Sequence, residues 1–393
     1  MNRPTNYTIF HCHSMLSTLT AGIDSVTRFE EYVSKAKECG MTAIGFSEHG
    51  NVFNHVHKKE FVESVGLKFI FAIEAYLTET TSEKLRDNYH AVLIAENGDA
   101  VHEILELVTK SFNRDDGHFF YKPRISFDEL FNTSKHVLVS TACVASPLFS
   151  GTDEAINKYI SFLSTNKDRC YLEVQHHPHA DTQKKYNAQL VELSKKYGIP
   201  LIAGTDTHCL NKQHEKARLI LQKSKNITFS GEDDWDLSFK TIDELINCYN
   251  EQGVLTEDEY YTAIENTNEM ASRIERYEWD RSIKYPHIYD NPEEEFKKQI
   301  NTGYKHNKYL HERYSKDEVK KRVNSEFDVY KKVGAIDFML LETHVLNWEK
   351  KNGIQRGYGR GSVSGSLIAY ILGITEMDSL KFNLNFFRLK KRK

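Results

Sequence analysis

The feature of this sequence that most constrains its fold is an alternation of short apolar runs with longer stretches of helical spacing in the first half of the chain. The spacing of Val26, Phe29 and Val33 predicts one helix, and residues 182–197 predict another that ends before Pro200. Strands that alternate with helices predict an α/β fold with a parallel sheet. Seven runs have the length and apolar character of strands: 7–10, 42–46, 68–73, 91–95, 136–139, 171–174 and 201–203.

Polar side chains stand next to every one of these runs. In parallel α/β folds the active site forms where the strands end. His90 is the exception, because it stands at the start of its run. A (β/α)7 barrel with one polar mouth explains the pattern, since right-handed crossovers bring the strand ends to one rim. The polar residues are His11, His13, Glu48, His49, Glu74, His90, Cys143, His177, Asp206 and His208.

These residues together predict a metal site. Each one alone has an ordinary explanation: Cys143 as a small core residue, Glu74 as the partner of a lysine, His90 as a hydrogen-bonded buried imidazole. Their coincidence at strand ends is what favours metal binding. Nitrogen, oxygen and sulfur donors suit zinc, manganese or iron better than calcium or magnesium, and so many donors predict several close cations.

Charge and cysteine content limit the class of protein. A formal net charge of −4 lacks the basic excess of a protein that grips duplex DNA by itself. The sequence has no apolar stretch of the roughly 20 residues that cross a bilayer, so we expect no membrane association. The 6 cysteines are scattered without paired spacing. Free thiols and a cytoplasmic location are the expectation.

The chain is expected to contain three parts. A metal-binding domain is predicted over residues 1–250, where most of the histidines lie. Charged helical stretches predict a helical linker and the start of a second domain over 251–333. Residues before Pro286 and Pro292 avoid the helical region, which is typical of extended segments. A compact, glycine-bearing segment is expected over 334–393.

That last segment contains a candidate phosphate-binding loop. Residues 357–366 are rich in glycine and serine and precede an apolar run that begins at Leu367. Such a loop exposes backbone N–H groups and the positive end of a helix, which suits a triphosphate. A glycine-rich turn that simply enters a core helix is the alternative. The candidate nucleotide-binding residues are Arg360, Gly361, Ser362, Gly365 and Ser366.

Several of these stretches resemble a known family, the polymerase and histidinol phosphatase (PHP) domain, in the form found in bacterial family C replicative polymerases of the DNA polymerase III alpha type. The similar segments are 10–14, 46–50, 73–76, 88–90, 141–143, 171–175 and 204–208. The resemblance implies a (β/α)7 barrel with a multi-metal cluster and phosphoesterase or 3′–5′ exonuclease activity. The ligands it implies are His11, His13, His49, Glu74, His90, Cys143, Asp206 and His208.

Two positions depart from the family pattern. Glu48 stands where an aspartate is usual, and Thr20 stands where the family has an acidic residue. Asp24 replaces that acid if the loop shifts. Glu48, Asp24 and His177 are therefore candidates either to bind metal or to support a ligand, and hydrolytic activity depends on this substitution.

Residues 359–375 are similar to the start of the polymerase palm, where the loop lies beside the incoming dNTP. A Pro-Asp-x-Asp-x-Asp motif, which supplies the catalytic carboxylates in the family, is absent from the sequence. We therefore expect this chain alone not to polymerise DNA, and magnesium to serve polymerisation only if the remaining palm is supplied. A gene interrupted by an intron, a split or a frameshift is expected, with a second polypeptide that carries the rest of the palm, the thumb and the fingers.

Three hypotheses remain open from the sequence. The leading one is the N-terminal portion of a replicative polymerase, whose partners are DNA and dNTP. A free-standing metal-dependent phosphoesterase is the second, although it leaves the glycine-serine loop unexplained. A non-catalytic scaffold of a split polymerase, stabilised by its metals, is the third.

Overall fold

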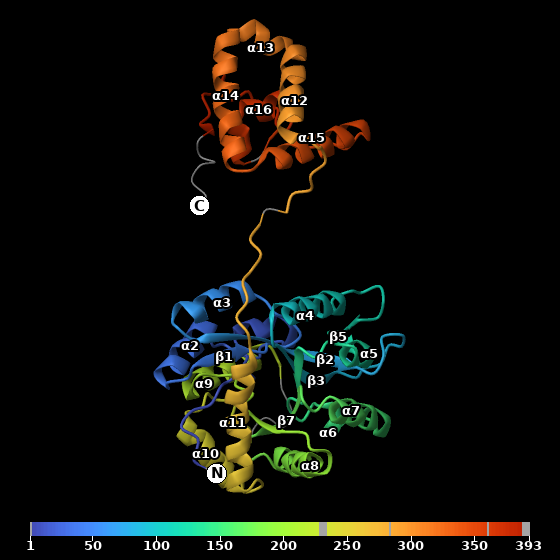
Figure 1. Cartoon of the computed structure of the whole chain (residues 1–393), viewed down its shortest axis with the longest axis vertical. Coiled ribbons are helices and arrows are strands. Elements are labelled where there is room, and N and C mark those ends of the chain that lie inside the picture. Colours follow the sequence, from blue (N-terminus) through green and yellow to red (C-terminus); the bar gives the residue numbers. More distant parts are fainter. Residues whose placement is uncertain (1, 228–233, 283, 360, 387–393) are drawn as a thin grey trace. The chain divides into compact units, whose positions relative to one another are not determined.

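The computed structural model describes residues 2–227, 234–282, 284–359 and 361–386 (Figure 1). The chain forms two compact units, Met1–Trp279 and Asp280–Lys393. This border differs from the expected ones at 250 and 333. Helix α11 (Glu257–Arg273) was expected in the linker, but it packs against the first unit, where Tyr260 and Ile264 join the apolar core. Arg360 and residues 387–393 lie outside the described residues.

The first unit is built on a curled sheet. Its strands follow the order β4-β5-β2-β3-β6-β7-β8, and β1 pairs with β2. Alternate strand residues enter two apolar clusters, as Leu138 does on one side and Val139 on the other. The strands are β1 (Ala43–Phe46), β2 (Lys68–Thr78), β3 (Tyr89–Ala95), β4 (Phe119–Phe120), β5 (Lys122–Ser126), β6 (Val137–Ser140), β7 (Cys170–Gln175) and β8 (Leu201–Gly204).

Residues 9–13 close the sheet into a barrel. On one side, the Gly45 amide donates to the Ile9 carbonyl at 2.7 Å. On the other side, the His13 amide donates to the Thr207 carbonyl at 2.8 Å. The first predicted strand therefore lies between β1 and β8, although it forms isolated bridges instead of a regular strand. All seven predicted runs lie in this barrel, so the predicted architecture is confirmed.

Among the seven predicted strands, one differs from the parallel arrangement. Strand β3 runs antiparallel to both β2 and β6. The physical reason is its connection: residues 79–88 join β2 to β3 without a helix, whereas a parallel neighbour needs a crossover. The start of β3 consequently lies at the rim where the parallel strands end. This places His90 among the other polar residues and explains its exceptional position in the sequence.

Helices surround the sheet (Figure 1). The predicted helix near residue 26 is α2, which begins at Phe29, and the predicted helix at 182–197 is α8. Gly198 ends α8 in the left-handed conformation, with φ of 69°. Among the described residues no helix is long and apolar enough to span a bilayer. The helices are η1 (Met15–Ser17), α1 (Thr18–Ala21), α2 (Phe29–Glu38), α3 (His55–Ser64), α4 (Gly98–Ser111), α5 (Phe127–Phe131), α6 (Pro147–Ser150), α7 (Asp153–Thr165), α8 (Asp181–Tyr197), α9 (Lys212–Ser224), α10 (Ile242–Gln252) and α11.

The second unit has its own apolar core, in which Phe296, Leu310, Leu340 and Leu367 are buried. Its described residues form helices and turns but no strand, so they lack the β part of the expected α+β palm segment. The helices are α12 (Pro292–His306), α13 (Lys308–Arg313), α14 (Lys316–Lys332), α15 (Ile336–Lys351), η2 (Ser362–Gly365) and α16 (Leu367–Ile371).

Candidate metal centre

The predicted ligands are spread over the sequence between residues 11 and 208, and they lie together at the rim of the barrel. Three groups of side chains each hold donor atoms within 4.8 Å of one another. All of these residues are buried except His90, which is partly exposed. The groups are His13, Asp24, His49 and His208; His11, His13, Glu74 and Asp206; and His49, Glu74 and His90.

The first group is arranged around Asp24. Its Oδ1 lies 3.2 Å from His208 Nε2 and 3.7 Å from His49 Nε2. Thr20 does not face this group, because its hydroxyl donates to the carbonyl of His49. Asp24 thus lies among these imidazoles, and its role in place of an acidic residue at position 20 stays a prediction. Helix α9 fixes the loop that carries Asp24, since Arg218 donates to the Asp24 carbonyl.

The second group is arranged around two carboxylates. Asp206 Oδ1 lies 3.2 Å from the Nε2 atoms of both His11 and His13. Glu74 lies 3.5 Å from His11 Nε2 and 3.3 Å from His13 Nε2. Asp206 has φ of 42°, in the left-handed region that is costly for a side-chain-bearing residue. Such local strain is concentrated at functional sites.

Glu74 also belongs to the third group, with its two oxygens facing different imidazoles. Oε1 lies 2.8 Å from His90 Nδ1, and Oε2 lies 2.7 Å from His49 Nδ1. The Cys143 sulfur lies 3.7 Å from His90 Nδ1 and 3.9 Å from Glu74. Cys143 is thus close enough to join this group. Glu74 is therefore shared by the second and third groups.

In two of the imidazoles, the ring nitrogen that faces away from the centre meets a hydrogen-bond acceptor. Nδ1 of His11 lies 2.6 Å from Glu173, and Nδ1 of His208 lies 2.8 Å from the Asp206 carbonyl. Each Nδ1 meets an acceptor, so the neutral ring carries its proton there and turns the Nε2 lone pair inward.

A direct test of fit comes from buried polar atoms without hydrogen-bond partners. Leaving such atoms unpaired costs about 1–3 kcal/mol each, so native structures contain few. Many of these atoms lie together at one rim, where a cluster of cations would provide their missing partners. Six of them belong to these groups, where they lie near one another without forming hydrogen bonds: His11 Nε2, His13 Nε2, Asp24 Oδ2, His49 Nδ1, Glu74 Oε2 and Asp206 Oδ1.

Electrostatics also favour positive charge here. Burial alone raises the pKa of Glu74, but the His49 and His90 imidazoles outweigh it and hold the pKa well below its usual value. Burial opposes protonation of His208, yet Asp24 and Asp206 raise its pKa to about 9. The pKa of His13 shifts in the opposite direction. Burial and the positive charges of His208 and His49 lower it to about 4. The site therefore keeps its carboxylates ionised and attracts cations.

Comparison with known families identifies the barrel. Residues 10–177 match the PHP domain. The barrel is a PHP domain. Residues 294–392 match the bacterial DNA polymerase III alpha NTPase domain, so the chain combines the two domains in that order. The resemblance to the PHP and bacterial replicative polymerase family is thereby confirmed.

Curated relatives extend the similarity to nearly the whole chain. It is 29% identical to DNA polymerase III subunit alpha of Aquifex aeolicus over 96% of this chain and 34% of that protein. The subunit of Borreliella burgdorferi is also 29% identical, with 96% and 33% covered. The subunit of Treponema pallidum is 27% identical, again with 96% and 33% covered. The chain thus spans about a third of the length of the curated relatives it matches.

Sequence reasoning missed Glu173 in β7, which supports the PHP centre. Its carboxylate accepts hydrogen bonds from Ser140 Oγ at 2.6 Å and Gln175 Nε2 at 2.9 Å, and it orients His11. Gly204 makes room for it, because a Cβ there would lie 1.9 Å from Glu173 Oε1. The signal was an ionisable residue inside an otherwise apolar strand, which must be paired when buried.

Glu48 and His177, which the sequence left as candidates either to bind metal or to support a ligand, lie outside the three groups. Glu48 accepts hydrogen bonds from the Ser14 amide at 3.0 Å and from Ser17 Oγ at 2.6 Å, and it pairs with Lys58. Since Ser17 donates to Glu48, it accepts from Nδ1 of His13, 2.9 Å away. Glu48 therefore orients a ligand. His177 is buried against Trp235, with ring centroids 4.6 Å apart.

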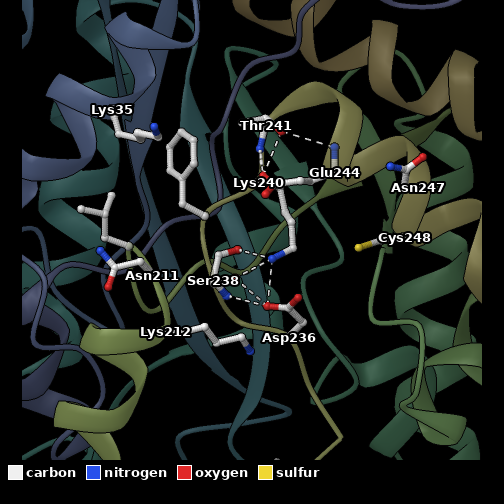
Figure 2. A pocket seen from close by; sticks show the side chains of 12 residues that line it. Lys35, Asn211, Lys212, Asp236, Ser238, Lys240, Thr241, Glu244, Asn247 and Cys248 are labelled. Carbon is white, nitrogen blue, oxygen red and sulfur yellow. Dashed lines mark hydrogen bonds and ion pairs between the residues drawn. The ribbon is translucent and has the colours of Figure 1, made fainter.

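A surface cavity of about 500 Å³ is lined by residues 210–212 and by the segment from Asp236 to Cys248 (Figure 2). Its wall is a hydrogen-bonded turn, in which Lys240 Nζ lies 2.8 Å from Asp236 and 2.6 Å from Ser238 Oγ. The Leu237 carbonyl of the same turn accepts a hydrogen bond from the His208 amide at 2.8 Å. This wall therefore holds His208 in place.

The structure places part of the candidate nucleotide loop in the core of the second unit. Gly365 and Ser366 are buried, and the Glu326 carboxylate accepts from Ser366 Oγ at 2.8 Å and from the Leu367 amide at 2.9 Å. A carboxylate thus caps the start of α16, where a phosphate was expected. Gly361 and Ser362 are exposed. A nucleotide role for this loop stays a prediction.

Proposed function

We propose that the PHP domain is a metal-dependent phosphoesterase that hydrolyses a phosphodiester at the end of a nucleic acid strand. The observation that carries this proposal is the convergence of histidine, carboxylate and thiol donors with unpaired buried atoms at one rim. Divalent cations supply Lewis acidity toward a phosphate group and lower the pKa of a bound water. The donor types favour zinc, manganese or iron.

Each group of residues has a defined role in this proposal. His11, His13, Glu74 and Asp206 would hold one cation; His13, Asp24, His49 and His208 a second; and His49, Glu74, His90 and Cys143 a third. Imidazoles that bind cations have no lone pair left to accept a proton, so we assign none of them as a general base. Glu173, Ser17 and Glu48 position ligands without touching the cations.

The similarity over 96% of the chain supports a wider proposal for the complete protein. This chain would be the N-terminal third of a DNA polymerase III alpha-like replicative polymerase that acts on DNA and dNTP in the cytoplasm. Polymerisation needs carboxylates for two magnesium ions, and the 393 residues lack the motif that supplies them. We therefore also propose that this chain alone does not extend a primer. A second polypeptide would carry the remaining palm.

The experiment combines metal analysis with hydrolysis. Purified protein is analysed for bound metals and incubated with bis(p-nitrophenyl) phosphate after supplementation with manganese, zinc or iron. We expect turnover that falls about 100-fold or more in His13→Ala and Asp206→Ala, with lower metal content. Full metal loading without turnover under all three supplements would contradict the phosphoesterase and favour the scaffold.

A further inference from the structure

The β4–β5 hairpin forms part of the rim of the metal centre. Its Lys122 donates a hydrogen bond from Nζ to the Thr20 carbonyl at 2.9 Å, beside the hydroxyl that binds the His49 carbonyl. The same ammonium group lies 5.0 Å from the ring centroid of Tyr76. That ring stacks on His49 with centroids 5.8 Å apart and planes 12° apart. Lys122 thus lies one aromatic ring away from the ligand candidate His49.

Cations on this hairpin and its neighbouring loops lie over aromatic rings. Arg86 lies 5.5 Å from the Tyr121 ring centroid, and Arg114 lies 4.3 Å from that of Phe119. Within the part of the chain that the structure describes, neither arginine nor Lys122 has a carboxylate within ion-pair distance. The surface cavity of Figure 2 differs, because its Lys212 and Lys240 are paired with Glu215 and Asp236. Arg86 and Arg114, on the loops beside the hairpin, therefore carry charge that no neighbouring carboxylate of the described residues neutralises, and Lys122 adds a positive charge nearer the centre.

Tyr121 is unusual in both exposure and backbone conformation. Its side chain stands at the hairpin turn, and the residue is 68% exposed. Its φ of 64° is rare for a bulky residue and costs free energy. The ring contacts Phe120, with centroids 4.7 Å apart, and Arg86 lies over it, yet most of the side chain stays exposed to solvent. Packing does not explain this arrangement, whereas an exposed aromatic ring beside unpaired cations is typical of platforms on which nucleobases stack.

We propose that the β4–β5 hairpin binds single-stranded nucleic acid and delivers its end to the metal centre. Tyr121 stacks on a base, and Arg86, Arg114 and Lys122 contact the backbone phosphates. The delivery step rests on the phosphoesterase proposed above. A single strand fits best because only an unpaired base exposes its face to a ring, and because the net charge of −4 disfavours a grip on duplex.

Binding is tested with the full chain and a 5′-fluorescein oligo(dT), measured by fluorescence anisotropy in calcium. We expect Tyr121→Ala to weaken binding about tenfold, within the range of one base–aromatic stack, and Tyr121→Phe to retain it. Arg86→Ala should reduce the slope of log affinity against log salt by about one. The same assay with oligo(U) separates DNA from RNA: a preference for either one keeps the proposal, because stacking does not depend on the sugar.

Two outcomes overturn the proposal. One is unchanged affinity in Tyr121→Ala and Arg86→Ala when both variants unfold at the wild-type temperature. The other is equal binding of a blunt duplex of the same length. Hydrolysis separates this inference from the proposed function: with manganese, Tyr121→Ala should lower the ratio of kcat/KM for oligo(dT) to that for bis(p-nitrophenyl) phosphate about tenfold. If the wild-type protein hydrolyses neither substrate, the phosphoesterase proposal fails, and the binding assay still decides whether the hairpin recognises a strand.

Discussion

At the scale of single residues, the centre depends on carboxylates that face more than one imidazole. Glu74 lies within 3.5 Å of ring nitrogens of His11, His13, His49 and His90. Asp24 has the same role in the neighbouring group, where it faces His49 and His208. Each carboxylate faces the imidazoles of its own group. Removal of one carboxylate should therefore weaken cation binding in that group more than in the others.

Replacement of Asp24 by asparagine tests whether this carboxylate serves mainly one cation position. The amide keeps the size of the side chain but removes its negative charge, so we expect the loss of about one metal equivalent while the group around Glu74 keeps its cation. Thr20→Ser is the matched control, since serine retains a hydroxyl for the His49 carbonyl, and it should keep the wild-type metal content. Elemental analysis of both proteins measures the effect. Equal metal content in Asp24→Asn and wild type would contradict the assignment of Asp24.

Proton competition gives a second prediction at this scale. The His208 pKa is raised to about 9 in the metal-free protein, so a cation must displace its proton at neutral pH. Apparent metal affinity should therefore fall as the pH is lowered from about 9, by roughly tenfold per pH unit for each displaced proton. Competition with a chelator over this range measures the slope. His208→Gln binds more weakly but should show a shallower slope, and an equal slope would contradict the role of His208.

At the scale of elements, the strands could be predicted from the sequence, but the direction of β3 could not. An apolar run shows where a strand lies in the sequence, because a buried strand needs apolar residues. The direction of the strand in the sheet depends instead on the segment that connects it to the previous strand. Residues 79–88 lack helical spacing, and this was the available signal. Ligand types at strand ends were likewise predictable. Asp24 could be named only as a candidate, because its place depends on the path of a loop, and Glu173 was missed, because its role depends on a neighbouring strand.

The contact between neighbouring strands at Glu173 and Gly204 gives a prediction at the element scale. A methyl group at residue 204 would overlap the Glu173 carboxylate in a strand pair fixed by hydrogen bonds. We expect Gly204→Ala to lower the free energy of unfolding by about 1–3 kcal/mol and to weaken metal binding by displacing His11. Thermal unfolding and elemental analysis measure the two effects.

Two further variants control this experiment. Gly357→Ala should be neutral, because no atom lies within 4 Å of the added carbon. Adding Glu173→Ala to Gly204→Ala should recover part of the lost stability, since the overlap disappears, but it should not restore metal binding. Additive losses of stability in the double variant would show that the two residues do not interact as the structure indicates.

At the scale of the whole molecule, the domain border follows from which core each helix joins. The amphipathic pattern of α11 predicts a buried face but not the partner that covers it. In the structure, Met270 and Ile274 join the apolar cluster of Phe10, Ile70 and Ile202. Lys68 adds hydrogen bonds to the Ala271 carbonyl at 2.8 Å and the Ile274 carbonyl at 3.0 Å. All predicted metal ligands belong to this same unit, so it should fold and bind metal without the second one.

Two truncations test the border. Residues 1–279 should unfold cooperatively and keep the metal content of the full chain, because their core is complete. Residues 1–250 lose the buried Tyr260, Ile264 and Met270 of α11. Each large core side chain contributes about 2–5 kcal/mol, against a total stability of about 5–15 kcal/mol for a typical domain. The shorter fragment should therefore aggregate or unfold without a transition, as measured by calorimetry and solubility. A stable, metal-loaded 1–250 fragment would instead support the border predicted from sequence and show that α11 only covers a barrel that is already complete.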